Sequence, residues 1–268
     1  MPGEVITSKA NPLVKRARRL KQRKYRDKEG AFLIEGIHLV WTAIENDVPI
    51  ETLLFCPGLL TSERASALVD AHEKMGLQVT LLSEEAYGAF SERQNPAGLA
   101  AIARATPSSL EELTVEEDSV FVVLDRVGNP GNLGTILRTL DAVGGSAAIL
   151  VGETCDPYHP AAVKASMGAL FAHPVVTVQS FGLVEEWARD NGVFSITTSA
   201  HAATDYWDAD YRGPIGLVLG SEAEGLPKEV RDAGDQSVRI PMEGNVTSLN
   251  LAVAAGILLY EVKRSRGS

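Results

Sequence analysis

Residues 119–145 read SVFVVLDRVGNPGNLGTILRTLDAVGG. The stretch opens with a near-continuous apolar run at 119–125, which is typical of a parallel strand buried on both faces. A glycine-rich turn follows, and residues 135–145 then have the spacing of a helix that ends at glycine. A buried strand, a tight turn and a helix in this order predict one unit of a parallel α/β sheet.

The alternation of strands and helices extends in both directions from this stretch. Towards the C-terminus, the patterns predict strands at 146–152, 173–179, 193–199, 214–222 and 236–242, and helices at 160–171, 182–192 and 248–266. Towards the N-terminus, they predict a strand and a helix within 31–46, strands at 52–56, 77–83 and 99–105, and helices at 62–76 and 83–91. A polar, acidic segment interrupts the pattern after residue 105. We therefore expect a smaller α/β domain at 1–105, a linker at 106–117 and a parallel-sheet domain at 118–268.

The composition is that of an ordinary globular protein, with 45% hydrophobic and 22% charged residues in 268. No apolar stretch approaches the roughly 18 residues of a membrane span, and the N-terminus lacks the apolar core of a secretory signal. We therefore expect a soluble, cytoplasmic protein. The two cysteines and five histidines have no metal-binding spacing, so no metal site is expected.

Positive charge is concentrated at the start of the chain. Residues 1–28 hold ten of the 25 Lys and Arg but only two acidic residues, which leaves a net charge of −18 on the remainder. Residues 9–28 are expected to form a helical basic arm, with Val14, Ala17 and Leu20 on one face. Such an arm favours RNA as a partner, and the expected contacts are Lys15, Arg16, Arg18 and Arg19. The alternative is an ordinary solvated helix face.

Three segments after residue 123 carry polar residues at positions typical of ligand sites. The first, LDRVGNPGNLGTILRT at 124–139, places Asn132 and Arg138 at a glycine-rich strand-to-helix turn. It lacks the G-x-G-x-x-G pattern of dinucleotide-binding folds and the Lys-Ser/Thr of a P-loop. A tight structural turn is the alternative interpretation.

The other two segments also follow expected strands. LVLGSEAEGLP at 217–227 places Glu222 after a strand, where a solvated acid or a helix cap is the alternative role. In IPMEGNVTSLNLAVAAG at 240–256, Thr247 or Ser248 is the expected helix cap, and Asn250 is expected to point into a pocket. Ligands collect at the carboxyl ends of strands in open parallel sheets, which favours a ligand site at the loop that holds Glu222.

In this order and spacing, the three segments resemble motifs one, two and three of the SpoU family of RNA ribose 2′-O-methyltransferases, within the SPOUT superfamily. The matching sequences are NPGNLGTILRTLDAVG, LGSEAEGLP and IPMEGNVTSLNLAVAAGILLYE, and the resemblance covers 118–268. The first part of the chain is similar, more loosely, to the substrate-binding domain of many members, through FLIEGIHLV at 32–40 and NPAGLAAI at 95–102.

The resemblance implies a deep trefoil knot that forms the pocket for S-adenosyl-L-methionine. The implied cofactor contacts are Gly220, Ile240 and Leu249, with Leu219, Met242 and Asn245 as neighbours. The implied catalytic group is Arg138, interpreted as a phosphate clamp, with a polar wall of Asn132, Glu222, Ser248 and Asn250.

Family members are usually homodimers through the knotted domain, for which the terminal helix offers Leu251, Leu258, Leu259 and Tyr260. The resemblance favours 23S rRNA as substrate. Methylation of tRNA and a non-catalytic RNA-binding role are the alternatives. A Rossmann-type oxidoreductase is disfavoured because its glycine fingerprint is missing.

Overall fold

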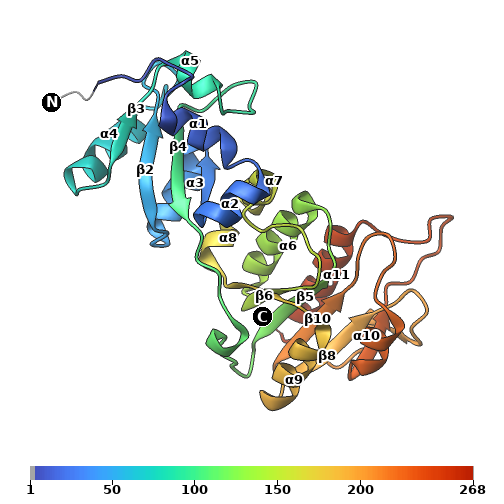
Figure 1. Ribbon diagram of the computed structural model, residues 1–268. Helices are drawn as coiled ribbons and strands as arrows, with labels where there is room; N and C mark the ends of the chain where they lie inside the picture. The colour runs from blue at the N-terminus through green and yellow to red at the C-terminus, as the bar shows by residue number, and fades with distance from the viewer. Residues whose placement is uncertain (1–3, 268) are drawn as a thin grey trace. The chain divides into compact units, whose positions relative to one another are not determined.

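The computed structural model describes residues 4–267 and contains two compact units (Figure 1). The first unit contains the chain up to Thr106 together with Tyr158–Phe171. The second contains Pro107–Pro157 and the chain from Ala172 onward. The outer ends of the two expected domains, at residues 1 and 268, lie outside the described residues.

The first unit is built on a four-stranded sheet of mixed direction. Its strand order is β1 (Ala31–Glu35), β4 (Leu99–Arg104), β2 (Ile50–Phe55) and β3 (Val79–Leu81). β4 is antiparallel to both of its neighbours, and β2 and β3 are parallel. The helices are α1 (Pro12–Arg19), α2 (Arg23–Glu29), α3 (Ile37–Glu45), α4 (Glu63–Lys74), α5 (Glu84–Gly88) and α7 (Pro160–Ser166). The sequence predicted each strand of this sheet within a few residues.

The expected basic arm is two short helices instead of one. Val14, Ala17 and Leu20 are buried on one side of α1, as their spacing predicted. The chain then turns, and α2 ends at Gly30, which adopts a left-handed conformation (φ 58°). The arm is therefore anchored to the sheet by its apolar face.

A segment far along the chain also packs in the first unit. The rings of Phe32 and Tyr158 lie 4.7 Å apart, and α7 packs against β1. The sequence pattern placed residues 158–171 in the second domain because it shows the order of elements but not which neighbour each helix covers.

The second unit contains a seven-stranded sheet in which every neighbouring pair is parallel. Its order is β7 (Val175–Val178), β6 (Ala147–Val151), β5 (Val120–Asp125), β10 (Ile215–Leu219), β8 (Phe194–Thr198), β11 (Gln236–Arg239) and β9 (Thr204–Asp205). β5 and β10 are adjacent, with Leu124 opposite Leu219. Their carboxyl ends are therefore level, and the loops that follow them begin side by side.

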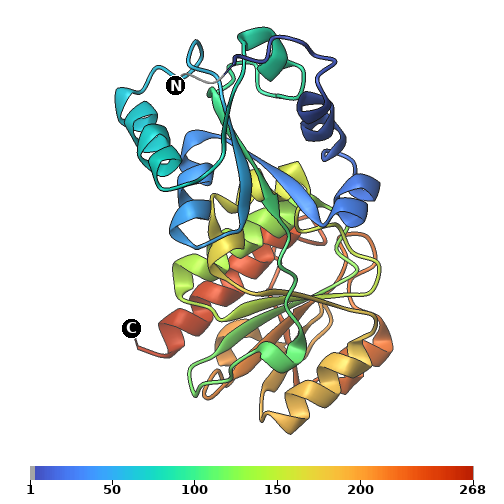
Figure 2. The ribbon, with the colours of Figure 1, turned by 60° about the vertical axis from the view of Figure 1, so that its left-hand side comes forward.

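Helices cover both faces of this sheet (Figures 1 and 2). One face carries α6 (Pro130–Val143) and α11 (Leu251–Ser265), which pack against each other. The other carries α9 (Phe181–Asp190) and α10 (Lys228–Ala233), whose apolar residues join a core cluster with Phe121 and Val123 of β5. α8 (Ala169–Ala172) is a single short turn before β7. The helices at 160–171 and 248–266 were predicted too long.

The expected linker packs on the second unit. It contains a short 3₁₀ turn, η1 (Leu110–Glu112), and a second such turn, η2 (Tyr206–Asp208), follows β9. Leu110 and Leu113 are buried in the core cluster, and Ser108 pairs with Val176 at the edge of the sheet. These leucines anchor a segment whose overall acidity suggested an exposed connection.

Within residues 4–267, no helix combines the length and apolar character that crossing a membrane requires.

Candidate active site

Asn132 stands in the first turn of α6, directly after the loop from β5. Asn129 caps this helix by accepting hydrogen bonds from the backbone N–H groups of Gly131 and Asn132, and Pro130 occupies its first position. The cap fixes the start of the helix, and with it the Asn132 side chain, above the carboxyl end of β5.

Both ends of the Asn132 amide are bonded. Its Nδ2 donates to Glu222 Oε1 at 2.9 Å, and its Oδ1 accepts from Asn250 Nδ2 at 3.1 Å. Asn132, Glu222 and Asn250 follow β5, β10 and β11 respectively, so the three segments meet at the carboxyl edge of the sheet. Three members of the implied polar wall are therefore joined in one continuous polar chain.

Glu222 is an exposed carboxylate held in its ionised form. Burial raises the pKa of Glu222. The hydrogen bonds from the Asn132 side chain and from backbone N–H groups, including that of Gly128, together lower it by more, so the net pKa lies below the ordinary value. A carboxylate with a lowered pKa is a poor proton acceptor at neutral pH. Glu222 therefore serves better as an orienting group than as a base.

Asn250 has a second role that the sequence assigned to its neighbours. It is the N-cap of α11, and its Oδ1 accepts from the backbone N–H groups of Ala252 and Val253 at 3.0 and 3.3 Å. The prediction that Thr247 or Ser248 caps this helix is wrong, because α11 begins three residues after Ser248. Ser248 is instead exposed in the preceding loop, at the wall of the adjoining cavity.

Arg138 lies on the same helix as Asn132 but outside the polar chain. Six residues separate them, which corresponds to about 9 Å along the axis and about 240° around it. Arg138 is exposed and, among residues 4–267, donates no hydrogen bond and forms no ion pair. Within the described residues, Asn132 does not bond to Arg138, because Glu222 and Asn250 bond both ends of the Asn132 amide.

A cavity of about 560 Å³ adjoins the polar chain. Five of the six expected cofactor contacts line it, namely Leu219, Gly220, Ile240, Met242 and Leu249. Asn245 does not; it is exposed in the loop before α11. The cavity also reaches Thr198, Ser199 and Arg231, which the sequence did not single out.

Gly220 shapes this cavity through the fold of its loop. A Cβ at this position would lie 2.1 Å from the carbonyl carbon of Gly225, so no residue with a side chain fits there. Ser221 and Gly225 form a bridge that closes the loop on itself. The cavity wall at Gly220 is therefore bare backbone.

Arg126 links the loop after β5 to the loop after β10, and the sequence did not single it out. Its Nε donates to Asp125 Oδ2 at 2.9 Å and its Nη1 to Glu224 Oε2 at 3.2 Å. Its backbone has a φ of 51°, a left-handed conformation that costs free energy for a residue with a Cβ. The available signal was a charged pair directly after a buried strand. The bonds tie the loop after β10 to the end of β5.

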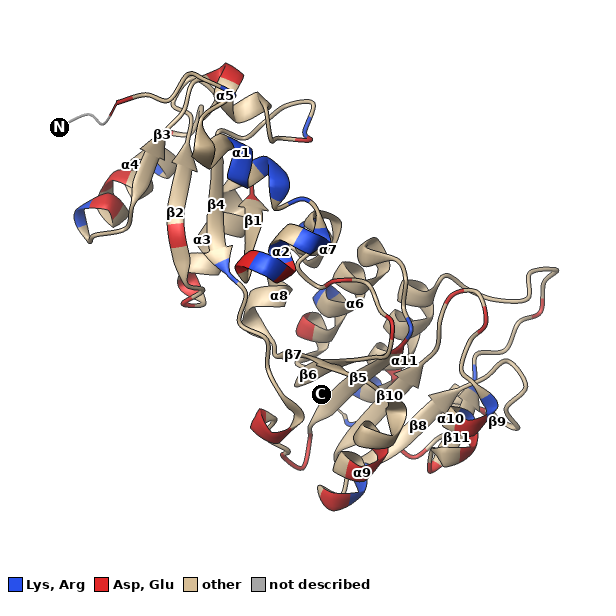
Figure 3. Cartoon of the chain, in the orientation of Figure 1, with Lys and Arg blue, Asp and Glu red and all other residues tan. Residues whose placement is uncertain are grey.

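Lys and Arg are concentrated on α1 and α2 (Figure 3), and these cations differ in whether they form ion pairs. Arg16, one of the expected RNA contacts, forms ion pairs with Glu29 at 2.7 Å and Glu51 at 2.5 Å. Its charge is therefore neutralised within the first unit. Lys15, Arg18 and Arg19 form no ion pair within the described residues, and Arg19 stacks over the ring of Tyr25. These three keep their charge available at the surface.

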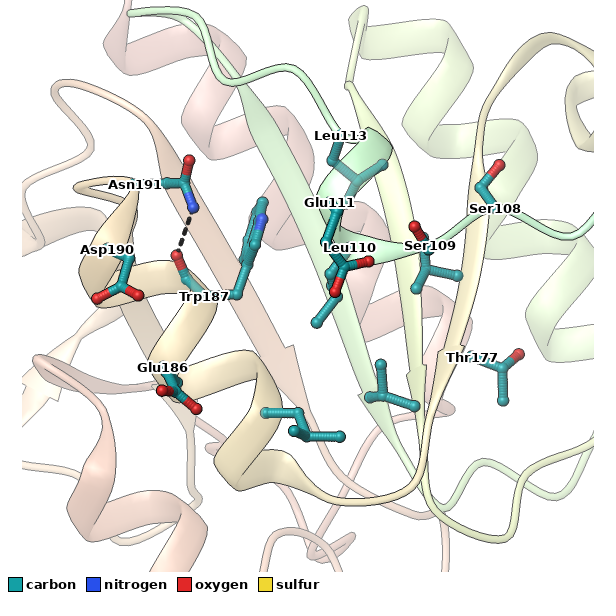
Figure 4. Close-up of a pocket in the computed structure, with 13 residues that line it drawn as sticks. Ser108, Ser109, Leu110, Glu111, Leu113, Thr177, Glu186, Trp187, Asp190 and Asn191 are labelled. Atoms are coloured by element: carbon teal, nitrogen blue, oxygen red, sulfur yellow. Dashed lines mark hydrogen bonds between the residues drawn. The ribbon is translucent and has the colours of Figure 1, made fainter.

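A second cavity, of about 490 Å³, lies between η1 and α9 (Figure 4). Its wall includes Trp187 and three acids, Glu111, Glu186 and Asp190. It contains no member of the polar chain at the strand ends. Among the described residues, no group of three or more His, Cys, Asp or Glu side chains is placed to hold a metal ion.

Comparison with known proteins gives two family matches and close relatives. The SpoU rRNA Methylase family matches residues 119–260, and the MRM3-like substrate binding domain matches residues 11–101. The 23S rRNA (uridine(2479)-2′-O)-methyltransferase of Streptomyces viridochromogenes is 34% identical over 92% of this chain and 87% of its own length. The 23S rRNA (guanosine(2553)-2′-O)-methyltransferase RlmP of Bacillus subtilis is 30% identical over 96% of this chain and 98% of its own.

A solved structure is also similar to this chain over nearly its whole length. The AdoMet-bound rRNA methyltransferase of Sinorhizobium meliloti is 38% identical and superposes with a TM-score of 0.88. The match covers 99% of each chain.

Proposed function

The chain belongs to the SpoU rRNA methylase family, and from this we propose that it transfers a methyl group from S-adenosyl-L-methionine to a ribose 2′-hydroxyl of 23S rRNA. The observation that supports this best is the polar chain Glu222–Asn132–Asn250 beside a cavity large enough for the cofactor. Three strand-end loops converge on one edge of a parallel sheet, where such folds bind ligands.

The residues present fit the cofactor. A cavity of about 560 Å³ is within the range of small-molecule sites. Leu219, Ile240, Met242 and Leu249 supply apolar walls for an adenine ring, and the loop at Gly220 presents backbone groups. Glu222 and Glu224 place negative charge at the cavity, which suits a cationic ligand. When bound, S-adenosyl-L-methionine supplies the electrophilic methyl group.

Arg138 is assigned to the RNA side of the reaction. A guanidinium binds phosphate through parallel hydrogen bonds, so Arg138 is assigned as a phosphate clamp and not as a base. Exposed and without an ion pair to any residue from 4 to 267, it can bind a phosphate next to the reacting ribose and stabilise charge developing on the 2′-oxygen.

The remaining polar groups position the reacting hydroxyl. Glu222 fixes the Asn132 amide, and Asn250 links that amide to the start of α11. Ser248, exposed at the cavity wall, offers a hydroxyl to the ribose. Held orientation of this kind lowers the barrier by removing the entropy cost of alignment.

The first domain, residues 1–105, is assigned to RNA binding, with 118–268 as the methyltransferase domain. Lys15, Arg18 and Arg19 support this because they are cations with no carboxylate partner among the described residues, in an otherwise acidic chain. Arg16 contributes to the fold of the arm instead.

Three finer features belong to the same proposal. The family resemblance implies a trefoil knot in the second domain, and the loops after β10 and β11, which share one cavity wall, are the segments assigned to it. Val253 and Tyr260 are 51% and 56% exposed seven positions apart on α11, which supports a homodimer through this helix. The expected contributions of Leu251, Leu258 and Leu259 are wrong, because these residues are buried within the chain itself. A ribosomal RNA substrate also favours the cytoplasm as the location of the protein.

A methyl-transfer assay tests the proposal. Protein and labelled S-adenosyl-L-methionine are offered unmodified 23S rRNA, 16S rRNA, bulk tRNA and large ribosomal subunits in separate reactions, and the methylated ribose is mapped. Label confined to 23S rRNA, free or in the subunit, is expected. Label in tRNA alone overturns the substrate, and cofactor binding without label in any RNA favours a non-catalytic factor.

A further inference from the structure

Arg231 lines the cofactor cavity without a counter-ion. It lies on α10, and its guanidinium donates one hydrogen bond within the described residues, from Nη1 to Ser199 Oγ at a long 3.4 Å. Its Nε is buried and donates to no group. Unpaired donors of a partly buried cation are costly unless a ligand satisfies them.

The other Arg and the two Glu side chains that line this cavity each have a partner. Arg239 donates to Asp205 at 2.6 Å, and Glu224 accepts from Arg126. Glu222 accepts from Asn132. Of the two arginines that line the cavity, Arg231 is therefore the one that forms no ion pair with any residue from 4 to 267.

The backbone of Arg231 is held in place by its surroundings. Thr197 Oγ1 donates to the Arg231 carbonyl, and the preceding residue, Val230, is buried in the core cluster. The guanidinium is thereby presented at the carboxyl end of β8, beside Ser199. Glu222 and Glu224 give another part of the same cavity negative charge, so the cavity carries charge of both signs.

We propose that Arg231 binds the carboxylate of the methionine moiety of S-adenosyl-L-methionine and selects for a cofactor that carries it. The inference rests on the proposed function. At neutral pH this carboxylate is the ligand's one anionic group, while its ammonium and sulfonium groups are cations. A guanidinium pairs with a carboxylate through parallel charge-assisted hydrogen bonds. Arg231 thus complements the carboxylate of the ligand, and the acidic part of the cavity complements its cationic groups.

The test compares two ligands by calorimetry, without any RNA. S-adenosyl-L-methionine and decarboxylated S-adenosylmethionine are titrated into the wild type, Arg231→Gln and Arg231→Lys. Lys228→Gln is the control, because it removes an exposed charge from the same helix away from the cavity. Melting temperatures without ligand verify that each variant folds.

We expect Arg231→Gln to weaken binding of the carboxylated cofactor by about 10- to 100-fold, as loss of a charged hydrogen bond does, and to leave the decarboxylated ligand nearly unaffected. Arg231→Lys should keep part of the preference and Lys228→Gln all of it. An unchanged preference in Arg231→Gln, or equal weakening of both ligands, overturns the assignment. If neither ligand binds the wild type, the proposed function fails as well.

Discussion

Asn250 Nδ2 donates a hydrogen bond of 3.1 Å to Asn132 Oδ1, although 118 positions separate the two residues. The same Asn250 side chain caps α11 through its oxygen. One amide thus fixes the start of a helix with its acceptor and the polar chain of the active site with its donor.

The two roles of Asn250 can be separated by substitution. Asn250→Ala removes both and should destabilise the protein by about 1 kcal/mol, the usual effect of losing an N-cap. Asn250→Asp keeps the capping oxygen but loses the donor to Asn132, so stability should stay near that of the wild type while methyl transfer falls. Chemical denaturation and single-turnover rates measure the two effects. Full activity of Asn250→Asp would show that the bond to Asn132 is dispensable.

Arg138→Ala should abolish chemistry without affecting the fold. The side chain is exposed and has no partner in the part of the chain that the structure describes, so the free energy of unfolding should change by less than about 0.5 kcal/mol. Methylation should fall by at least about 100-fold, the effect of removing one key electrostatic group, while cofactor affinity is retained. Turnover close to that of the wild type would exclude Arg138 from the reaction.

The sequence predicted what local patterns determine. The apolar run of β5, the spacing of Val14, Ala17 and Leu20, and the glycine-rich turn before α6 each have a local cause. That the three loops would share a site was implied by the family resemblance, and the parallel strands, whose carboxyl ends lie at one edge of the sheet, bring Asn132, Glu222 and Asn250 together.

The pairings that depend on distant side chains could not be predicted. Thr247, Ser248 and Asn250 are all good caps, and only the exact start of α11 selects Asn250. The ion pair between Arg126 and Glu224, 98 positions apart, depends on the register of β5 against β10. Arg16 appeared in a run of similar cations, and only the positions of Glu29 and Glu51 distinguish it.

The conformation of Arg126 predicts an unusual order of stabilities. Arg126→Ala loses the bonds to Asp125 and Glu224 and keeps the left-handed backbone of a residue with a Cβ. Arg126→Gly loses the same bonds but relieves this strain, so it should be more stable than Arg126→Ala by about 1 kcal/mol. Urea denaturation measures the difference. Both variants should lose activity, because the loop after β10 is no longer bonded to the end of β5. If Arg126→Gly were less stable than Arg126→Ala, the backbone at Arg126 would not be strained.

The lowered pKa of Glu222 predicts how its contribution depends on pH. The folded state favours the ionised form, so the stabilisation is fully present above the ordinary glutamate pKa of about 4.3 and is lost as the pH falls through the lower folded value. The wild type should therefore exceed Glu222→Gln in stability near pH 7, and the two should converge in acid. Denaturation curves from pH 7 to pH 3 measure this. A gap that widens in acid would reverse the sign of the shift.

The unpaired cations of the arm predict the salt dependence of RNA binding. Replacing Lys15, Arg18 and Arg19 with Gln should weaken binding to 23S rRNA fragments and reduce the log–log salt slope by about 0.7 for each single-strand phosphate that the arm no longer neutralises, or about 2 in all. Arg16→Gln is the matched control. It should leave the slope nearly unchanged and lower stability by up to about 1 kcal/mol, because Glu29 and Glu51 already hold its charge. Equal slopes for the triple variant and the wild type would place RNA binding elsewhere, whereas a larger effect of Arg16→Gln would mean that RNA displaces its internal ion pairs.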